Sequence, residues 1–439
     1  MSIIKEYINR TPTSKKLHER GCNIFPGGYT RSTIYIDIPY PTYIAKAQGC
    51  KVWDVDGNEY IDYINNYGPL ILGHNNQKVV EAVKKQLEIM WSGGVTEIEI
   101  KLGEKVKELY SNAEKIIFCP TGSEACMKAV RTYRAISGKE KIAMFNIAYH
   151  GSSDSLSFQE GTPKDFLNKI VLLPFNDIEG IERLLKENRD ELAAVMVEPT
   201  LGRIGHEPAK PDFYKAIRSM TKDIGIPLVF DEIVDGFRLA PGGAQERFGV
   251  KADMSVLGKV LGGGLPLAAI ASSEETMRIW GVQKSTSLDI IGPRIPNTGT
   301  YNDTKISIAA GLATIEQLNP QMYSHLEKIG EKVRKGLREI CSHLKIKAQV
   351  TGIGSLFSIF FTDEPIVTPS DVLRANKLVY RYFTMSLLNK GIIFGKGGNP
   401  SFCSTAMTEE IVNKTLEAAE ESLMKMRPLI EEIAPPLIN

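Results

Sequence analysis

A single lysine, Lys259, stands in an apolar and glycine-rich stretch, DMSVLGKVLGGGLPLAAIAS (253–272). Lysine is rarely buried without a partner, and consecutive glycines occur where a chain turns sharply or approaches a ligand closely. An amine at such a turn is suited to form an imine with an aldehyde and then to act as a base or an acid. The stretch alone is equally compatible with a lysine whose tip reaches solvent out of a tight loop.

A second candidate site opens the helix predicted at GSEACMKAVRTYRAIS (122–137), directly after the predicted strand KIIFC. Thr121, Gly122 and Ser123 stand at this junction, so that free backbone N–H groups and two hydroxyls converge on one spot. Such a helix start suits an anion, and a phosphate in particular. The alternative is an ordinary helix N-cap with Glu124 in the first turn.

Two further predicted strands end in side chains that could contact a flat ring. Tyr149 and His150 follow KIAMFN, and the tyrosine could either stack on an aromatic ligand or fill the surface. Asp231 ends the apolar strand IPLVFDE, where a carboxylate needs a cation, a metal or a hydrogen-bond donor. As an alternative, Asp231 and Glu232 are surface acids that cap a helix.

Together, these four groups match the parts of pyridoxal 5′-phosphate. The helix start would bind the phosphate, Tyr149 would stack on the pyridine ring and Asp231 would keep the ring nitrogen protonated. Lys259 would form the imine, and the glycines at 262–264 would let the chain turn away beneath it. We therefore predict this cofactor and no metal.

The segments between these groups predict an α/β fold. From about 115 to 310, short apolar runs alternate with helical patterns of ten or more residues, which is typical of a mostly parallel sheet covered by helices on both faces. In such sheets, ligands bind at the carboxyl ends of the strands, where the candidate residues stand.

The remaining patterns predict the organisation of the chain outside this block. Helices are predicted at 77–91, 97–110, 304–318, 322–344, 369–390 and 408–427, strands within 349–361, and a hairpin at DVDGNEY. We predict an N-terminal segment, residues 1–65, that packs with a small domain, a large cofactor-binding domain at 66–310, and that small C-terminal α+β domain at 311–439.

The composition argues against several classes of function. The 439 residues include 53 Lys and Arg and 52 Asp and Glu, a net charge of +1, so no global field favours nucleic acid or an anionic membrane. The six cysteines have no CxxC spacing, which indicates reduced thiols in a cytoplasmic protein. The N-terminus lacks the apolar core of a signal peptide, and no apolar run approaches the length of a membrane span.

The segment VFDEIVDGFRLAPGGAQERFGVKADMSVLGKVLGGGLPLAAI resembles the cofactor-lysine segment of class III aminotransferases, and within them the glutamate-1-semialdehyde 2,1-aminomutase branch. The resemblance runs nearly end to end. Further matching segments are FPGG (25–28), GCKVWDVDGNEYIDYI (49–64), GPLILGH (68–74), TGSEACMKAVR (121–131), YHG (149–151), VEP (197–199), TGT (298–300) and VTGIGSLFSIFFTDEP (350–365).

This resemblance implies a transferase of fold type I that uses pyridoxal 5′-phosphate and acts as a homodimer with active sites at the subunit interface. It gives Lys259 the covalent bond to the cofactor and Asp231 the pyridine nitrogen, with Ile233 under the ring and Tyr149 over it. The catalytic residues would be Lys259, Asp231 and Tyr149. The matched motifs add the following cofactor-binding residues: Thr121, Gly122, Ser123, His150, Glu198 and Thr300 of the partner subunit.

The sequence departs from the aminomutase pattern where a substrate would bind. The family's Gly-Asn-Pro after the Thr300 turn is replaced by Asp-Thr-Lys at 303–305. Arg203 follows EPTLG, where the aminomutase has an asparagine after EPVVG. A late active-site glutamate of the aminomutase aligns near Asn399, and a tryptophan near its entrance corresponds to Tyr67.

Two arginines are candidates to bind a substrate carboxylate. PGGYTRS (26–32) resembles the segment of β-amino-acid aminotransferases whose arginine binds a carboxylate, and that arginine is Arg31 here. Arg203 is the second candidate, and Tyr67 completes the predicted substrate-binding set. A planar guanidinium matches a carboxylate with two parallel hydrogen bonds, although most arginines are solvated surface residues.

The predicted function is amino-group transfer between an amino acid or amine, with a β-amino acid as the favoured donor, and a 2-oxo acid. The alternative is glutamate-1-semialdehyde 2,1-aminomutase, which moves an amino group within one molecule in tetrapyrrole synthesis. An epimerase on the same scaffold ranks lower. A nucleotide-binding oxidoreductase ranks last, because the glycine cluster follows a lysine and forms no GxGxxG fingerprint.

Overall fold

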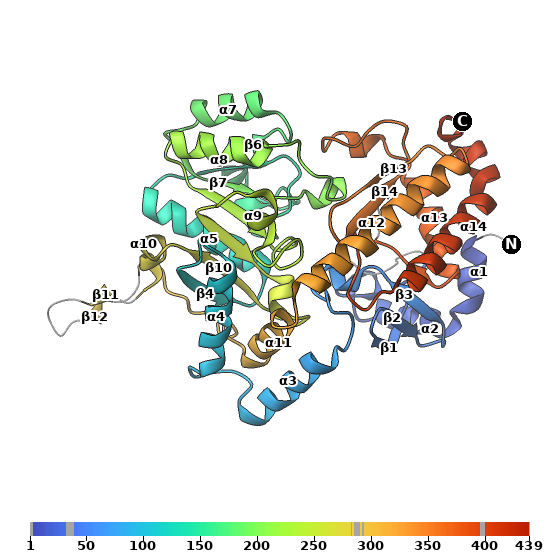
Figure 1. Ribbon diagram of the computed structural model, residues 1–439, viewed down its shortest axis with the longest axis horizontal. Coiled ribbons are helices and arrows are strands. Elements are labelled where there is room, and N and C mark those ends of the chain that lie inside the picture. The colour runs from blue at the N-terminus through green and yellow to red at the C-terminus, as the bar shows by residue number, and fades with distance from the viewer. Residues whose placement is uncertain are drawn as a thin grey trace. The chain divides into compact units, whose positions relative to one another are not determined.

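The computed structural model describes residues 3–31, 39–281, 294–395 and 400–438, with the backbone of 283–284 and 290–291 (Figure 1). Its contacts divide the chain into two compact units. The central unit consists of residues 77–201 and 209–323, and the terminal unit of residues 1–76, 202–208 and 324–439. The three-part division that the sequence suggests stays a prediction.

A seven-stranded sheet forms the core of the central unit, in the order β4-β10-β9-β8-β7-β5-β6. The strands are β4 (Lys115–Cys119), β5 (Lys141–Phe145), β6 (Ile170–Leu173), β7 (Leu192–Val197), β8 (Leu228–Glu232), β9 (Met254–Leu257) and β10 (Ala268–Ser272). Strands β5 to β9 run parallel, and only β10 is antiparallel to its neighbours within this sheet. Because every residue of β7 to β10 is buried, both faces are covered. The predicted α/β class is confirmed.

Helices cover this sheet and connect its parallel strands. They are α3 (Gln77–Ile89), α4 (Glu97–Leu109), α5 (Gly122–Ser137), α6 (Lys164–Leu167), α7 (Ile178–Glu187), α8 (Phe213–Asp223), α9 (Gly243–Phe248), α10 (Glu274–Met277) and α11 (Lys305–Ile315). Helices α7 and α8 lie side by side (Figure 1). The short strands β11 (Gln283–Lys284) and β12 (Ile290–Ile291) pair with each other. Helix α5 ends at Gly138, whose left-handed φ of 71° confirms the predicted end.

The turn after β9 packs tightly against α11. Residues Lys259–Gly262 form the 3-10 helix η5, and Gly263 follows with a left-handed φ of 58°. A Cβ atom at Gly263 would lie closer than 3.0 Å to the carbonyl oxygen of Ala310 on α11. The glycine therefore allows the backbone of the turn to contact the backbone of α11. This contact holds η5 close to the edge of the sheet.

Two small sheets belong to the terminal unit. One has the order β1-β2-β3-β15, and the other β13-β14-β16. Their strands are β1 (Ile44–Gln48), β2 (Lys51–Asp54), β3 (Glu59–Asp62), β13 (Gln349–Thr351), β14 (Leu356–Phe360), β15 (Ile392–Ile393) and β16 (Ser401–Phe402). The predicted hairpin is confirmed as β2 and β3, and its turn is closed by Asp54 Oδ1, which accepts the N–H groups of Asp56 at 3.0 Å and Asn58 at 2.8 Å.

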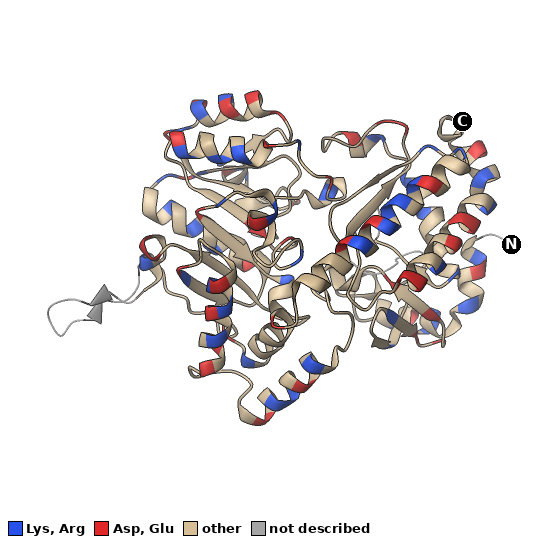
Figure 2. Cartoon of the chain, viewed as in Figure 1, with Lys and Arg blue, Asp and Glu red and all other residues tan. Residues whose placement is uncertain are grey.

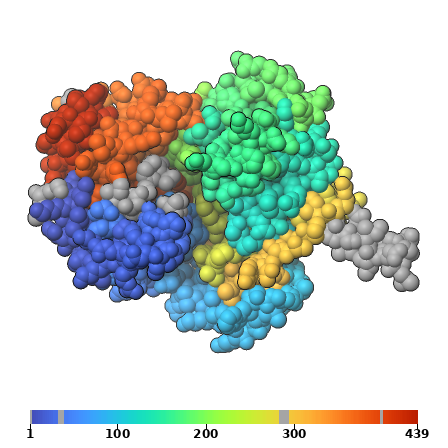
Figure 3. Space-filling model, turned by 180° about the vertical axis from the view of Figure 1, so that it is seen from behind, coloured from blue at the N-terminus to red at the C-terminus, as the bar shows by residue number. Residues whose placement is uncertain are grey.

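The terminal unit joins the two ends of the chain. Its helices are α1 (Ile3–Arg10), α2 (Pro12–Cys22), α12 (Pro320–His343, from Ser324 on), α13 (Lys377–Asn389) and α14 (Glu409–Ile433). The N-terminal segment lies beside the C-terminal helices (Figure 3), and Asn389 Nδ2 donates to the Ile3 carbonyl at 2.9 Å. The helices predicted from the sequence begin only at residue 77 and do not include α1, which packs against α13.

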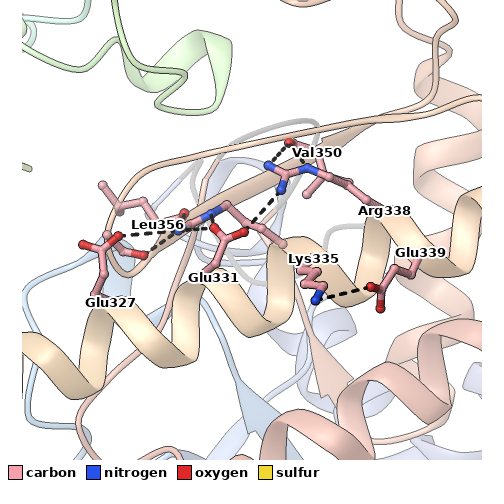
Figure 4. A network of polar contacts seen from close by, with 9 residues as sticks. Glu327, Glu331, Lys335, Arg338, Glu339, Val350 and Leu356 are labelled. Carbon is pink, nitrogen blue, oxygen red and sulfur yellow. Dashed lines mark hydrogen bonds and ion pairs between the residues drawn. The ribbon is translucent and has the colours of Figure 1, made fainter.

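Charged residues of both signs are interspersed along α12 and α14 (Figure 2). One cation of α12, Arg334, is 3% exposed and donates to the carbonyl oxygens of Gly354 at 2.7 Å and Leu356 at 2.8 Å. It also pairs with Glu331 at 2.9 Å, and Figure 4 shows the surrounding network, including Arg338. None of the helices in the described ranges is long and apolar enough to cross a membrane.

We expect Gly263→Ala to destabilise the protein more than Gly225→Ala. Both glycines have a left-handed φ, 58° and 69°, but a Cβ at Gly225 meets nothing within 4 Å. Gly225→Ala should lower the free energy of unfolding by about 1 kcal/mol through its backbone alone. Gly263→Ala should lower it by about 1–3 kcal/mol more, because the methyl group would overlap α11. Urea denaturation of both variants measures the difference, and equal losses would contradict the close packing.

Candidate active site

The candidate residues of the central unit lie at one edge of its sheet. Thr121, Gly122 and Ser123 follow β4, Tyr149 and His150 follow β5, Glu198 follows β7, Asp231 and Ile233 stand at the end of β8, and Lys259 follows β9. Because β10 reverses direction between β9 and β4, β4 points the same way as the parallel strands. All of these side chains therefore meet at the carboxyl edge.

Asp231 is the centre of the hydrogen-bond network at this edge. Its Oδ2 accepts a hydrogen bond from His150 Nδ1 at 2.7 Å and one from the Cys126 thiol at 3.3 Å, while Oδ1 accepts the Ile233 N–H at 3.1 Å. Burial disfavours the charged imidazole, but the hydrogen bond and charge of Asp231 raise the pKa of His150 above its ordinary value. Asp231 is 4% exposed, and its Oδ1 can accept one more donor.

The same side chains have the chemistry of metal ligands. The ligand atoms of Cys126, His150 and Asp231 all lie within 4.8 Å of one another. In this structure they are engaged with each other through hydrogen bonds, and burial holds the pKa of the Cys126 thiol well above its usual range. A neutral thiol is a donor to the carboxylate and a poor metal ligand.

The loop that carries Tyr149 is fixed against the start of α5. Glu198 accepts the Tyr149 N–H at 2.8 Å, and Ser123 Oγ accepts the Ser152 N–H at 3.2 Å. Gly151 has a φ of 90°, and a Cβ atom there would lie closer than 3.0 Å to Ser123. With its backbone held in this way, the Tyr149 side chain remains 52% exposed and available to stack on a ligand ring.

Ile233 packs against the backbone of two glycines. A Cβ atom at Gly122 would lie 2.9 Å from Ile233 Cδ1, and one at Gly258 would lie 2.7 Å from it. The side chain of Ile233 therefore rests directly on backbone at both positions. Any larger residue at 122 or 258 would push the isoleucine out of this place.

The start of α5 has the features of an anion site. Thr121 is the N-cap residue, and its Oγ1 accepts the Glu124 N–H at 3.2 Å. The first N–H groups of a helix have no partner within it, and they carry the positive end of the helix dipole. With the Ser123 hydroxyl, they can bind a phosphate.

Lys259 combines a strained backbone with a perturbed amine. Its φ of 47° lies in the left-handed region, which costs a non-glycine residue roughly 1–3 kcal/mol and is found most often at functional positions. Burial lowers the pKa of its amine to about 8, although the carboxylates of Glu198 and Asp231 act in the opposite direction. The residues present thus supply a phosphate site, a carboxylate, an apolar side chain and an amine, which fit pyridoxal 5′-phosphate.

Sequence reasoning missed two members of this cluster. Cys126 stands one helical turn after Ser123 on α5, and this spacing is the signal that could have placed it on the same helix face. Asp235 accepts hydrogen bonds from the backbone N–H of Thr200 at 3.0 Å and from its hydroxyl at 2.5 Å. Burial raises the pKa of Asp235 to about 7, and no motif in the sequence indicates this pair.

The other predicted site residues lie elsewhere in the chain. Arg31 and Tyr67 belong to the terminal unit, as does Arg203 in the 3-10 helix η4 (Gly202–Ile204). Thr300 is exposed in the loop that precedes α11. Asn399 lies outside the described residues.

Arg31 and Tyr67 contact each other at the wall of a cavity of about 560 Å³. The Arg31 guanidinium lies 5.3 Å from the centre of the Tyr67 ring and donates a hydrogen bond to Asn66 Oδ1. Apolar side chains form much of the remaining wall, among them Leu17 and Ile24. The cavity could therefore hold a ligand with an apolar body and a negative charge.

Several known proteins are similar to this chain over nearly its whole length. The family described as Aminotransferase class-III matches residues 36–426. A glutamate-1-semialdehyde 2,1-aminomutase of Methanococcoides burtonii is 37% identical over 423 residues, which cover 92% of this chain and 97% of that protein. An omega-transaminase from Sphaerobacter thermophilus is 34% identical, with a TM-score of 0.89 over 96% of this chain and 99% of that one. A β-phenylalanine aminotransferase from Variovorax paradoxus is 27% identical, with a TM-score of 0.89 over 97% of both chains.

We expect the amine of Lys259 to react with acetic anhydride at an unusually low pH in ligand-free protein. An amine whose pKa is about 8 is half neutral near that pH, and the neutral form is the nucleophile, so labelling should rise as the pH passes through this value. Peptide mass spectrometry measures the labelled fraction at each pH. In Glu198→Gln the midpoint should fall further, since one attractive carboxylate is removed. Labelling of Lys259 only at a pH well above 8 would contradict the burial argument.

Proposed function

This chain belongs to the class III aminotransferases, and on that premise we propose that it transfers an amino group between an amino acid and a 2-oxo acid. We propose a β-amino acid as the donor. Pyridoxal 5′-phosphate is the cofactor. The observation that carries the proposed substrate class is Arg31 at the wall of a largely apolar cavity.

We propose that the central unit holds the cofactor through the residues at its sheet edge. Lys259 would form the covalent bond, and Asp231 would bind the ring nitrogen with its free capacity on Oδ1. Tyr149 and Ile233 would enclose the ring. Thr121, Gly122 and Ser123 would bind the phosphate, while His150 and Glu198 hold Asp231 and the Tyr149 loop in place. The bound cofactor supplies an electron sink and a carrier for the amino group.

Lys259 would also move protons. Its amine, with a pKa of about 8, is near the value that suits a base and an acid at neutral pH. Burial raises the pKa of Glu198 to about 7, so the charge opposite the lysine changes within the same pH range. Asp231, held by three donors, would keep the ring nitrogen protonated throughout.

The substrate carboxylate is assigned to Arg31 in this proposal. Contact with Tyr67 and the hydrogen bond to Asn66 fix the guanidinium, which then needs less ordering when a carboxylate binds. The neighbouring apolar wall suits an aryl or alkyl side chain. The likeness to a β-phenylalanine aminotransferase supports the same class of donor. Arg203 is the second candidate for this role.

Glutamate-1-semialdehyde 2,1-aminomutase is the second candidate function. Relatives that carry this name are 33–37% identical over more than 90% of the chain, and they support intramolecular transfer more directly than they support the first candidate. Against it stand the Asp-Thr-Lys at 303–305 and Arg203, where that branch has other residues. An epimerase has no comparable support.

We further propose that the protein is a cytoplasmic homodimer in which Thr300 of the partner subunit completes the phosphate site. The cytoplasmic location is supported by the six cysteines, all of which are free thiols. The homodimer is supported by the exposure of Thr300 and Tyr301, the latter 64% exposed, on the loop before α11.

A panel of amino donors, each mixed with the purified protein, tests the proposed function. We expect β-amino acids with apolar side chains to convert the bound aldehyde to the amine form of the cofactor, and a 2-oxo acid to restore it. Absorbance of the cofactor measures both half-reactions. Turnover of glutamate-1-semialdehyde without an oxo acid, with no response to the panel, would establish the second candidate instead.

Arg31→Ala should raise the KM for carboxylate substrates by roughly tenfold or more, the scale of one lost charge-assisted contact. Amines without a carboxylate serve as the internal control, and their KM should change far less. Steady-state kinetics on an acid and on its matched amine measure the two effects. An unchanged KM for acids in Arg31→Ala, with a raised KM in Arg203→Ala, would assign the carboxylate to Arg203.

A further inference from the structure

Lys305 is a buried cation that the proposed chemistry does not use. It is the first residue of α11 and is 0% exposed. Its Nζ pairs with Asp303 Oδ2 at 2.7 Å and with Glu99 on α4. Glu99 also accepts the Thr96 N–H at 3.0 Å in the capping box of α4. Lys305, Asp303 and Glu99, here called the Lys305 triad, thus connect the loop before α11 to the start of α4.

The opposite side of the same loop is tied to α5. Lys128 on α5 donates to Asn297 Oδ1 at 2.7 Å, and Asn302 Nδ2 donates to the same oxygen at 2.8 Å. Lys128 is 5% exposed and also pairs with Glu124, in the first turn of α5, at 3.1 Å. The loop is therefore anchored on both sides by buried lysines.

Between these anchors the loop makes a turn at Thr300. The Asn302 N–H donates to the Gly299 carbonyl at 3.1 Å and closes a tight turn around Thr300. A Cβ atom at Gly299 would lie closer than 3.0 Å to the side chain of Asn302, so a larger residue fits at 299 only if Asn302 moves. Thr300 itself is exposed. Burying Lys305 has a desolvation cost that its ion pairs often fail to offset. What the Lys305 triad provides is a fixed connection between α4 and the loop that carries Thr300.

We propose that Lys305 is a positioning residue that holds the Thr300 turn so that its hydroxyl can bind the cofactor phosphate of a second copy of the chain. This inference rests on the proposed function and on the proposed homodimer.

The test compares two aldehydes that differ only in the phosphate. Wild-type protein and Lys305→Met, both freed of cofactor, are titrated with pyridoxal 5′-phosphate and with pyridoxal, and absorbance of the bound aldehyde gives each affinity. Lys305→Met should bind the phosphorylated compound about tenfold more weakly, the effect of one hydrogen bond to a charged group. Its affinity for pyridoxal should stay within about twofold. An equal loss for both aldehydes, or no loss for either, would overturn the proposal.

A double-mutant cycle tests the route through Thr300. Thr300→Val should lower the preference for the phosphorylated aldehyde as much as Lys305→Met does, and the double variant should lose little more. Fully additive losses would mean that Lys305 does not act through this hydroxyl.

If Lys305→Met fails to fold, Glu99→Gln keeps an oxygen for Thr96 and loses only the charge. It should lower the preference by about threefold, and an unchanged preference would overturn the proposal.

Arg334→Met is the matched control for the loss of a buried cation. Arg334 is 3% exposed and belongs to α12 in the terminal unit. This variant should lower the melting temperature without changing the preference for the phosphorylated aldehyde. A changed preference would mean that the loss of any buried cation has this effect, and it would overturn the assignment.

If the wild-type protein binds neither aldehyde, the proposed function itself fails. If the wild-type protein prefers the phosphorylated aldehyde and Lys305→Met has the same preference, only the proposed role of Lys305 fails.

Discussion

A carboxylate buried at the end of a strand must accept hydrogen bonds from the groups around it. Asp231 is such a carboxylate, and the fold of the central unit has to supply its donors. The donors come from three parts of the chain: the thiol of Cys126 from α5, the imidazole of His150 from the loop after β5, and the backbone of Ile233 from the turn after β8. They converge because β8 lies in the middle of the sheet, with β7 and β9 beside it. The order of the strands thus brings the donors to Asp231, and the buried carboxylate in turn needs that order.

The other buried acids of this edge follow the same rule, each with its own donor. Glu198 accepts the Tyr149 N–H, Asp235 accepts two hydrogen bonds from Thr200, and Glu232 accepts from Gln245. Burial raises the pKa of Glu198 and of Asp235 to about 7 and lowers the pKa of Lys259 to about 8. Shifted pKa values of this kind are found together most often at functional sites.

Much of this arrangement could be predicted from local patterns, because apolar strands, a helix N-cap and a glycine turn are signals of a few consecutive residues. The start of α5 at Gly122 and the end of β8 at Asp231 are of this kind. Contacts between distant segments have no such signal. The role of Cys126 depends on its hydrogen bond to Asp231. The role of Lys305 depends on its ion pair with Glu99, which lies 206 positions earlier in the chain. Helix α1 was missed for the same reason, because its partner α13 comes near the other end of the sequence.

The pairing of distant strands in the terminal unit limits the order in which this protein can fold during synthesis. Strand β3 pairs in parallel with β15, and the Tyr63 N–H donates to the Ile393 carbonyl at 3.0 Å. During synthesis on the ribosome, the first 76 residues must wait for the last hundred before their sheet can close, whereas the central unit finds most of its partners within its own stretch of chain. Contacts of such long sequence separation form slowly. Residues 59–62 therefore have no β15 to pair with until the chain has been made beyond residue 393, and a chain that stops before that point would leave β3 without this partner.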